Sequence, residues 1–176
     1  EREIGLTLSH LNKYAEANAL LELSFNIYRI LSIADPLEYR DELVDTLSTL
    51  GFSYTRENRK TEAVWAIQEA IDITAQSCEM NPERYMPILA NLHFKYGQTI
   101  QFLFLAGPLD ELFNEDLSSA ERGDIEYYLQ EAITSLERSL YTYLDLRKQF
   151  PNQYSTELAT LKLVLGDLYF SNSVIF

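Results

Sequence analysis

Histidine, cysteine and carboxylate side chains are the groups that could perform chemistry in this 176-residue chain. The only histidines are His10 and His93, and the only cysteine is Cys78. No His-x-x-x-His or Cys-x-x-Cys pattern is present to hold zinc. Cys78 has Glu79 beside it and no histidine near it in sequence, which disfavours a reactive thiolate. These residues predict neither a metal site nor a nucleophile.

Motifs for phosphate binding and acyl transfer are also missing. The sequence has no glycine-rich phosphate loop and no Gly-x-Ser-x-Gly turn. Glu38, Asp41 and Glu42 lie near an expected helix start, where negative charge complements the helix dipole. We therefore expect no catalytic residues and no cofactor, and we predict that the chain is not an enzyme.

The composition bears on the partner, on the fold class and on the cellular location. The 27 acidic residues exceed the 14 basic ones, which gives a net charge of −13 and disfavours binding to nucleic acid. Hydrophobic residues make up 47% of the chain, enough for a core, and 6 glycines with 5 prolines are few for an all-β fold. No apolar stretch has the length of a membrane-spanning helix. With its single cysteine, the sequence predicts a cytoplasmic protein without membrane insertion.

The chain resembles itself at an offset of 46 residues. Gly5, Gly51 and Gly97 are spaced by this offset, as are Pro36 and Pro82. Further pairs at the same offset are Asn12 and Asn58, Ala17 and Ala63, Leu21 and Ile67, and Tyr39 and Tyr85. Such a recurrence of glycine, proline and small residues predicts an internal repeat.

The third repeat unit is longer than the others. The sequence Gln68-Glu69-Ala70-Ile71 returns at 130–133, an offset of 62, whereas Pro82 and Gly97 return as Pro151 and Gly166, an offset of 69. We interpret this as a 16-residue loop insertion followed by two extra helical turns. The expected organisation is one array over 1–176, with units at 1–35, 36–81, 82–150 (acidic insertion near 105–123) and 151–176, the last one partial.

Apolar residues within each unit have helical spacing, as in the run from Tyr39 through Leu43, Leu47 and Leu50 to Tyr54. Asp35 and Asn81 are expected to cap the helices that begin near Pro36 and Pro82. The sequence predicts an all-α fold of about seven helices with no strands, over 1–11, 14–33, 38–54, 60–79, 84–105, 122–148 and 154–171.

The segment Leu47-x-x-Leu50-Gly51-x-x-Tyr54, followed by Ala63-x-x-x-Ile67-x-x-Ala70, resembles a tetratricopeptide repeat (TPR). The period of 46 residues, longer than the usual ~34, resembles the long-helix variant found in kinesin light chains. The resemblance implies a right-handed superhelical solenoid of antiparallel helical hairpins. Ile125 departs from the pattern, because a small residue is expected there.

The resemblance also implies a function, that of a non-catalytic protein–protein interaction scaffold or adaptor. In this family the first helices of successive hairpins line a concave groove that holds a peptide or a partner helix. Carried over by repeat position, the partner-binding residues are Asp45, Ser48, Phe52, Thr55, Asn91, Phe94, Gln98, Gln101, Phe102, Leu163, Asp167 and Phe170. The alternative is a sensor or regulatory arm of a larger signalling protein whose effector domain lies outside this chain.

Two further features bear on partners. The acidic insertion is expected to be a solvated loop, but Leu109, Leu112 and Phe113 have the spacing of a short amphipathic helix that could dock on the array itself or on a partner. The helix expected over 154–171 has no second helix to complete its hairpin, and residues 174–176 are apolar. We expect this end to continue into more helix or to be buried in an assembly, including self-association.

Overall fold

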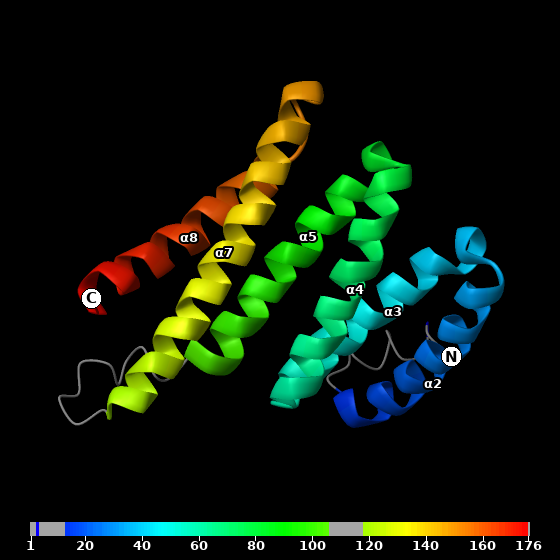
Figure 1. The fold of residues 1–176 in the computed structure, drawn as a ribbon, viewed down its shortest axis with the longest axis horizontal. Helices are drawn as coiled ribbons and strands as arrows, with labels where there is room; N and C mark the ends of the chain where they lie inside the picture. The colour runs from blue at the N-terminus through cyan, green and yellow to red at the C-terminus, as the bar shows by residue number, and fades with distance from the viewer. Residues whose placement is uncertain (1–2, 4–12, 106–117, 176) are drawn as a thin grey trace. The chain divides into compact units, whose positions relative to one another are not determined.

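The computed structural model describes residue 3, residues 13–105 and residues 118–175 (Figure 1). The chain divides into two compact units, Glu1–Met80 and Asn81–Phe176, each of which is described by itself.

The described residues form six α-helices and one π-helical segment, with no strand. The predicted all-α class is confirmed. The predicted number of about seven helices is not reached, because the helix expected over 1–11 lies outside the described residues except for residue 3. Leu109, Leu112 and Phe113 also lie outside them.

The first unit contains helices α2 (Tyr14–Ala34), α3 (Pro36–Arg56) and α4 (Lys60–Met80). Helix α3 packs against both α2 and α4. The start of α3 follows directly from its sequence: Pro36 occupies the first turn, and the Asp35 carboxylate accepts a hydrogen bond from the Glu38 backbone N–H at 3.2 Å. Asn58, at φ 58°, lies in the tight turn between α3 and α4. The predicted cap at Asp35 is confirmed.

Close packing between α3 and α4 depends on Gly51. A Cβ atom built at Gly51 would collide with Ile67 Cγ1 and would lie 3.4 Å from the carbonyl oxygen of Ala63. Ala63 and Ile67 are both buried. Glycine is therefore the residue that allows the two helices this approach.

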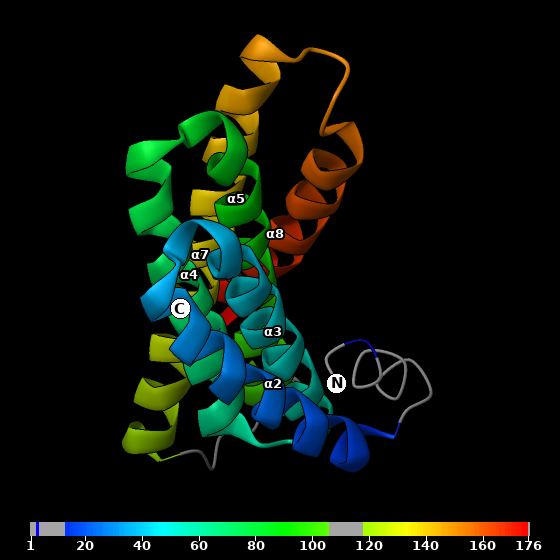
Figure 2. The same cartoon turned by 90° about the vertical axis from the view of Figure 1, so that its right-hand side faces the viewer.

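The second unit contains α5 (Pro82–Ile100), a π-helical segment η1 (Gln101–Leu105), α7 (Ser119–Gln149) and α8 (Ser155–Ile175). Helix α7 packs against both α5 and α8 (Figure 1), and the connection from α7 to α8 is visible at the top of Figure 2. Asn81 caps α5 by accepting from the Arg84 N–H at 3.2 Å, as predicted. The helix expected over 84–105 changes to π-helical hydrogen bonding at Gln101, which apolar periodicity does not indicate.

Gly97 repeats the role of Gly51 in this second unit. A Cβ at Gly97 would lie 2.6 Å from Leu136 Cγ and 3.1 Å from the carbonyl oxygen of Ala132. Ala132 and Leu136 therefore correspond to Ala63 and Ile67 at an offset of 69 residues. The sequence-based register, an offset of 62 that placed Ile125 at the small position, is two helical turns away from this packing.

Candidate partner-binding surface

His93 and Ser135 form the contact in the described residues that most resembles a catalytic pair. His93 Nδ1 lies 3.3 Å from Ser135 Oγ, and the Ser135 hydroxyl donates a hydrogen bond to the His93 carbonyl oxygen at 3.0 Å. Burial, together with the nearby positive charge of Arg138, lowers the pKa of His93 to about 4. Ser135 is buried, and its hydroxyl hydrogen is engaged in the hydrogen bond to the His93 carbonyl oxygen. The pair therefore ties α5 to α7 and presents no accessible nucleophile.

Cys78 is half-buried in α4, and burial raises the pKa of its thiol. A raised pKa leaves less reactive thiolate at neutral pH. Within the described ranges, no cluster of three His, Cys, Asp or Glu side chains could hold a metal ion. His10 lies outside these ranges. Nor is any described helix both long and apolar enough to cross a membrane.

Two of the predicted groove positions are exposed in each of α3, α5 and α8, which are the first helices of the predicted hairpins. The first position is occupied by Asp45 in α3, Asn91 in α5 and Thr160 in α8. The second, seven residues further along each helix, is occupied by Phe52, Gln98 and Asp167. Phe52 is 53% exposed, even though its ring meets that of Tyr14 edge-on at 6.4 Å. These positions share one helix face, because seven residues make nearly two turns.

The other two predicted groove positions change their environment along the chain. Ser48 and Thr55 are buried in α3, and the Thr55 hydroxyl donates to the Gly51 carbonyl oxygen at 2.7 Å. At the equivalent positions of α5 and η1, Phe94 and Gln101 are half-buried. In α8 the equivalents are the most open, with Leu163 66% and Phe170 71% exposed. Phe102, in η1, is 50% exposed.

A tyrosine–glutamate hydrogen bond recurs in both units, and the sequence analysis did not predict it. The Tyr54 hydroxyl donates to Glu22 Oε1 at 2.7 Å, which links α3 to α2. The Tyr169 hydroxyl likewise donates to Glu137 Oε1, which links α8 to α7. In each pair the glutamate lies 32 residues before the tyrosine. This common spacing is the sequence signal from which the two contacts could have been predicted.

Arg59 completes the cluster in the first unit. Its guanidinium lies 4.2 Å from the centre of the Tyr54 ring and forms ion pairs with Glu22 at 3.3 Å and Glu62 at 3.0 Å. Burial and the hydrogen bond to Glu22 raise the pKa of Tyr54, so that its hydroxyl stays protonated. The cluster joins α2, α3 and α4 and has a structural role.

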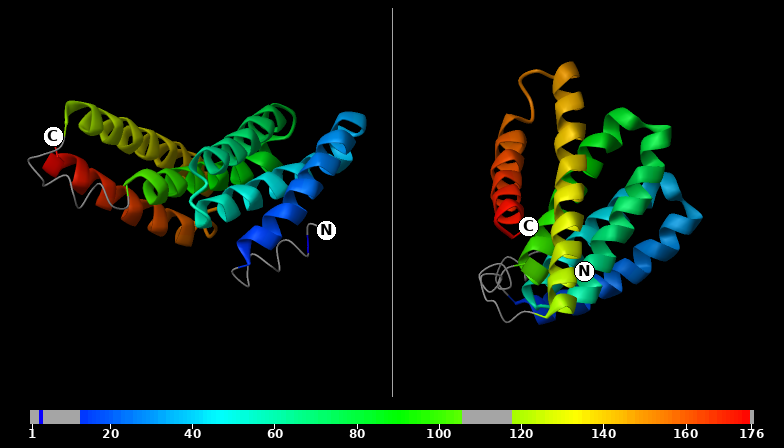
Figure 3. Two further views of the ribbon diagram at one scale, coloured as in Figure 1. Left: turned by 90° about the horizontal axis from the view of Figure 1, so that it is seen from below. Right: turned by 60° about the vertical axis from the view of Figure 1, so that its left-hand side comes forward.

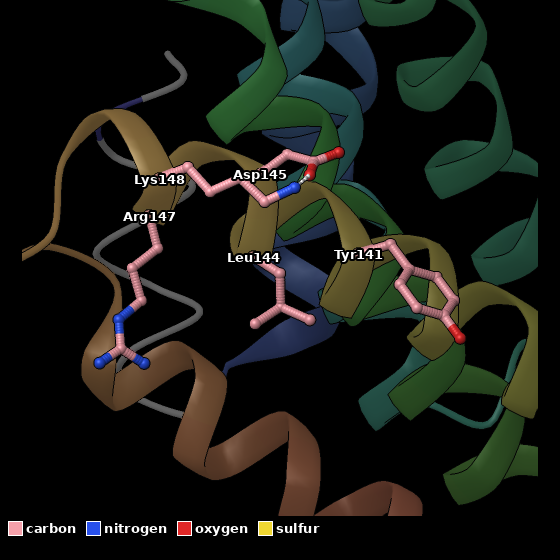
Figure 4. Close-up of a pocket in the computed structure, with 5 residues that line it drawn as sticks. All are labelled: Tyr141, Leu144, Asp145, Arg147 and Lys148. Carbon is pink, nitrogen blue, oxygen red and sulfur yellow. Dashed lines mark hydrogen bonds and ion pairs between the residues drawn. The ribbon is translucent and has the colours of Figure 1, made fainter.

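A pocket of about 490 Å³ lies along the C-terminal half of α7 (Figure 4). It is lined by Tyr141, Leu144, Asp145, Arg147 and Lys148. Lys148 is paired with Asp145 at 2.6 Å. Because all five lining residues belong to one helix, a ligand would be held from one side only. This arrangement does not indicate a specific binding site.

Comparison with protein families, with curated proteins and with solved structures finds no match for this chain. The fold is that of a helical, repeat-like protein.

Proposed function

We propose that the chain is a non-catalytic interaction scaffold of the tetratricopeptide-repeat type, which binds a peptide or partner helix along the exposed face of its first helices. One observation carries the proposal. The positions of Phe52 and Gln98 are 46 residues apart and are both exposed, whereas Gly51 and Gly97 beside them are buried against the following helix. An exposed position that recurs once per repeat offers each unit a contact point for a partner.

The chemistry of this face favours a particular kind of partner. Phe52 and Phe102 supply large apolar surfaces, and Asn91 and Gln98 supply amide donors and acceptors. Aromatic side chains with few rotatable bonds are frequent affinity hot spots, and amides bind the backbone of an extended peptide. A peptide with apolar anchors fits this combination. The net charge of −13 further favours a partner carrying basic residues outside the anchors.

Quantitative capture of partners from a cell extract tests the proposal. The bait is the whole chain, compared with a Phe52→Ala, Phe94→Ala and Phe170→Ala triple variant. Each truncation is expected to reduce affinity by about 1–2 kcal/mol, so the triple variant should lose its specific partners. Tyr141→Ala is the matched control, because it removes an exposed aromatic residue from α7, outside the proposed groove.

The result can also contradict the proposal. A partner that is retained by the triple variant but lost when residues 107–121 are deleted would assign binding to the acidic insertion. Circular dichroism of every variant establishes that helix content is unchanged, so that lost binding cannot be attributed to unfolding.

A further inference from the structure

The first half of α7 carries an exposed aromatic side chain beside carboxylates. Tyr127 is 61% exposed, and its ring meets that of Tyr128 edge-on with ring centres 5.3 Å apart. Asp124 lies three residues before Tyr127 and Glu131 lies four residues after it, so these four side chains share one side of the helix. The same part of α7 packs against η1 (Figure 3, right).

Two side chains from outside α7 contact this group. The Tyr96 hydroxyl of α5 donates a hydrogen bond to Glu131 Oε2 at 3.3 Å, and Phe104 of η1 stacks on Tyr128 with ring centres 4.0 Å apart. Phe104 belongs to the π-helical segment, and π-helical turns are frequent at functional sites. We call Tyr96, Asp124, Tyr127, Tyr128 and Glu131 the Tyr127 cluster.

The packing of the repeat does not account for this cluster. At the offset of 69 residues, Lys60, the first residue of α4, corresponds to Leu129 of α7. The part of α7 that precedes Leu129 therefore has no counterpart in α4. It contains Asp124, Tyr127 and Tyr128. An exposed tyrosine in this additional part of the helix is not needed to pack one repeat unit on the next.

The surroundings of Tyr127 are acidic. Between residues 119 and 137, α7 has one basic residue, Arg122, and five acidic residues, which are Glu121, Asp124, Glu126, Glu131 and Glu137. Neither Asp124 nor Glu131 forms an ion pair within the described part of the chain. A positively charged group is attracted both by such carboxylates and by the negative face of an aromatic ring. The local charge thus favours a cationic ligand.

The first unit shows which cation such a group binds. There the Tyr54 hydroxyl donates to Glu22, and the Arg59 guanidinium lies 4.2 Å from the centre of the tyrosine ring. Arg59 also forms ion pairs with Glu22 and with a second carboxylate, that of Glu62. The Tyr127 cluster has the same components: a tyrosine–glutamate hydrogen bond, an accessible tyrosine ring and a second carboxylate. No arginine of the described residues pairs with its carboxylates.

We propose that the Tyr127 cluster binds an arginine side chain of a partner protein, with the guanidinium on the Tyr127 ring and paired with Asp124 and Glu131. Arginine suits the cluster better than lysine, because its planar guanidinium stacks on an aromatic ring and donates to two carboxylates at once. The inference does not rest on the proposed groove, since no member of the cluster is a predicted groove residue.

Three labelled peptides test this chemistry. Each has the pattern Ser-X-Ser-X-Ser-X-Ser, with arginine, lysine or citrulline at X. Lysine keeps the charge without the planar group, and citrulline keeps the shape without the charge. Fluorescence anisotropy with the whole chain in about 0.15 M salt measures the dissociation constants, since weak long-range attraction is then screened. We expect the arginine peptide to bind about two- to fivefold more tightly than the lysine peptide, and the citrulline peptide to bind least.

Tyr127→Ala and Tyr141→Ala are a matched pair of variants. Both tyrosines lie on α7, and both are 61% exposed. Removal of the Tyr127 ring should weaken binding of the arginine peptide about two- to fivefold, which is the contribution of an exposed cation–π contact. Tyr141→Ala should bind this peptide as wild type does. Circular dichroism establishes that both variants keep their helix content.

Glu131→Gln and Glu126→Gln are matched in charge, because each removes one carboxylate from α7. At about 100° per residue, Glu126 lies on a different side of the helix from Asp124 and Glu131. Glutamine at position 131 keeps an oxygen that can accept from the Tyr96 hydroxyl. Glu131→Gln should weaken binding of the arginine peptide about two- to fivefold, and Glu126→Gln should leave it nearly unchanged.

Three results would overturn the proposal. The first is equal affinity for the arginine and lysine peptides, which would indicate unspecific attraction by the net charge. The second is an equal effect of the two glutamine variants or of the two tyrosine variants, because the cluster would then have no special role. The third is binding that the triple groove variant loses and Tyr127→Ala retains, which would assign the peptide to the groove. The triple variant is expected to bind the arginine peptide normally, so either proposal can fail without the other.

Discussion

Replacing Gly51 by leucine should destabilise the first unit, whereas the same replacement at Gly123 should not. A single Cβ at Gly51 already collides with Ile67, so the three further carbons of leucine must displace α4. Overpacking of this kind costs about 1–3 kcal/mol or more. Gly123 has open space around it, and leucine is favoured over glycine within a helix by about 0.8 kcal/mol. The two substitutions should therefore change stability in opposite directions.

Urea denaturation measures both effects, and the only tryptophan makes the signal local. Trp65 lies in α4, two residues before Ile67, so its fluorescence reports on the first unit. Because the chain has two compact units, fluorescence and circular dichroism should be recorded together. A Gly51→Leu midpoint at or above that of wild type would refute the packing of α3 on α4.

A double-mutant cycle tests whether a leucine at position 51 overlaps with the side chain of Ile67. Ile67→Ala alone should cost about 2–5 kcal/mol, because Ile67 is buried. In the Gly51→Leu background the same truncation makes room for the new side chain and should cost at least about 1 kcal/mol less. Strict additivity would mean that the destabilisation arises elsewhere.

Further predictions concern the tyrosines and His93. Tyr54→Phe removes a hydrogen bond at a position only 5% exposed and should cost about 1 kcal/mol in urea denaturation, whereas Tyr169→Phe, at 44% exposure, should cost less. The pKa of His93 is lowered to about 4, so unfolding should become easier as the pH falls from about 6.5 towards 4, and His93→Leu should remove that part of the slope. Burial raises the pKa values of Tyr96 and Tyr143 to about 12; the free energy of unfolding should then fall as the pH rises from about 10 to 12, measured by circular dichroism, and Tyr143→Phe should reduce the fall.

Local signals in the sequence predicted the helix starts. Pro36 with Asp35, and Pro82 with Asn81, predicted where α3 and α5 begin, because proline in the first turn and an Asx cap act within four residues. The recurrence of Gly51 at Gly97 marked both glycines, but their contacts with the following helix are seen only in the structure. The predictions of the helix starts needed no knowledge of distant contacts.

The register of α7 could not be predicted in the same way. A shift of seven residues is nearly two turns, so it leaves the buried face of a helix unchanged. The similarity of 130–133 to 68–71 favoured one register, whereas the contact of Gly97 with Leu136 selects the other. Helical periodicity carries no information between these two registers, and only the packing distinguishes them.

The degree to which each predicted groove residue is buried also depended on its neighbours. Ser48, Phe94 and Leu163 occupy one repeat position, but they range from buried to exposed. The repeat pattern assigned them the same role because it records position along a helix, not which other helices are present.

Three residues at one repeat position show how the residue type varies with burial. Leu47 is fully buried against its neighbours, His93 is half-buried and contacts Ser135, and Lys162 is exposed. A permanently buried face would favour an apolar residue at this position, since an unpaired buried lysine is costly. The side chain at this position thus becomes more polar as its exposure increases from α3 through α5 to α8.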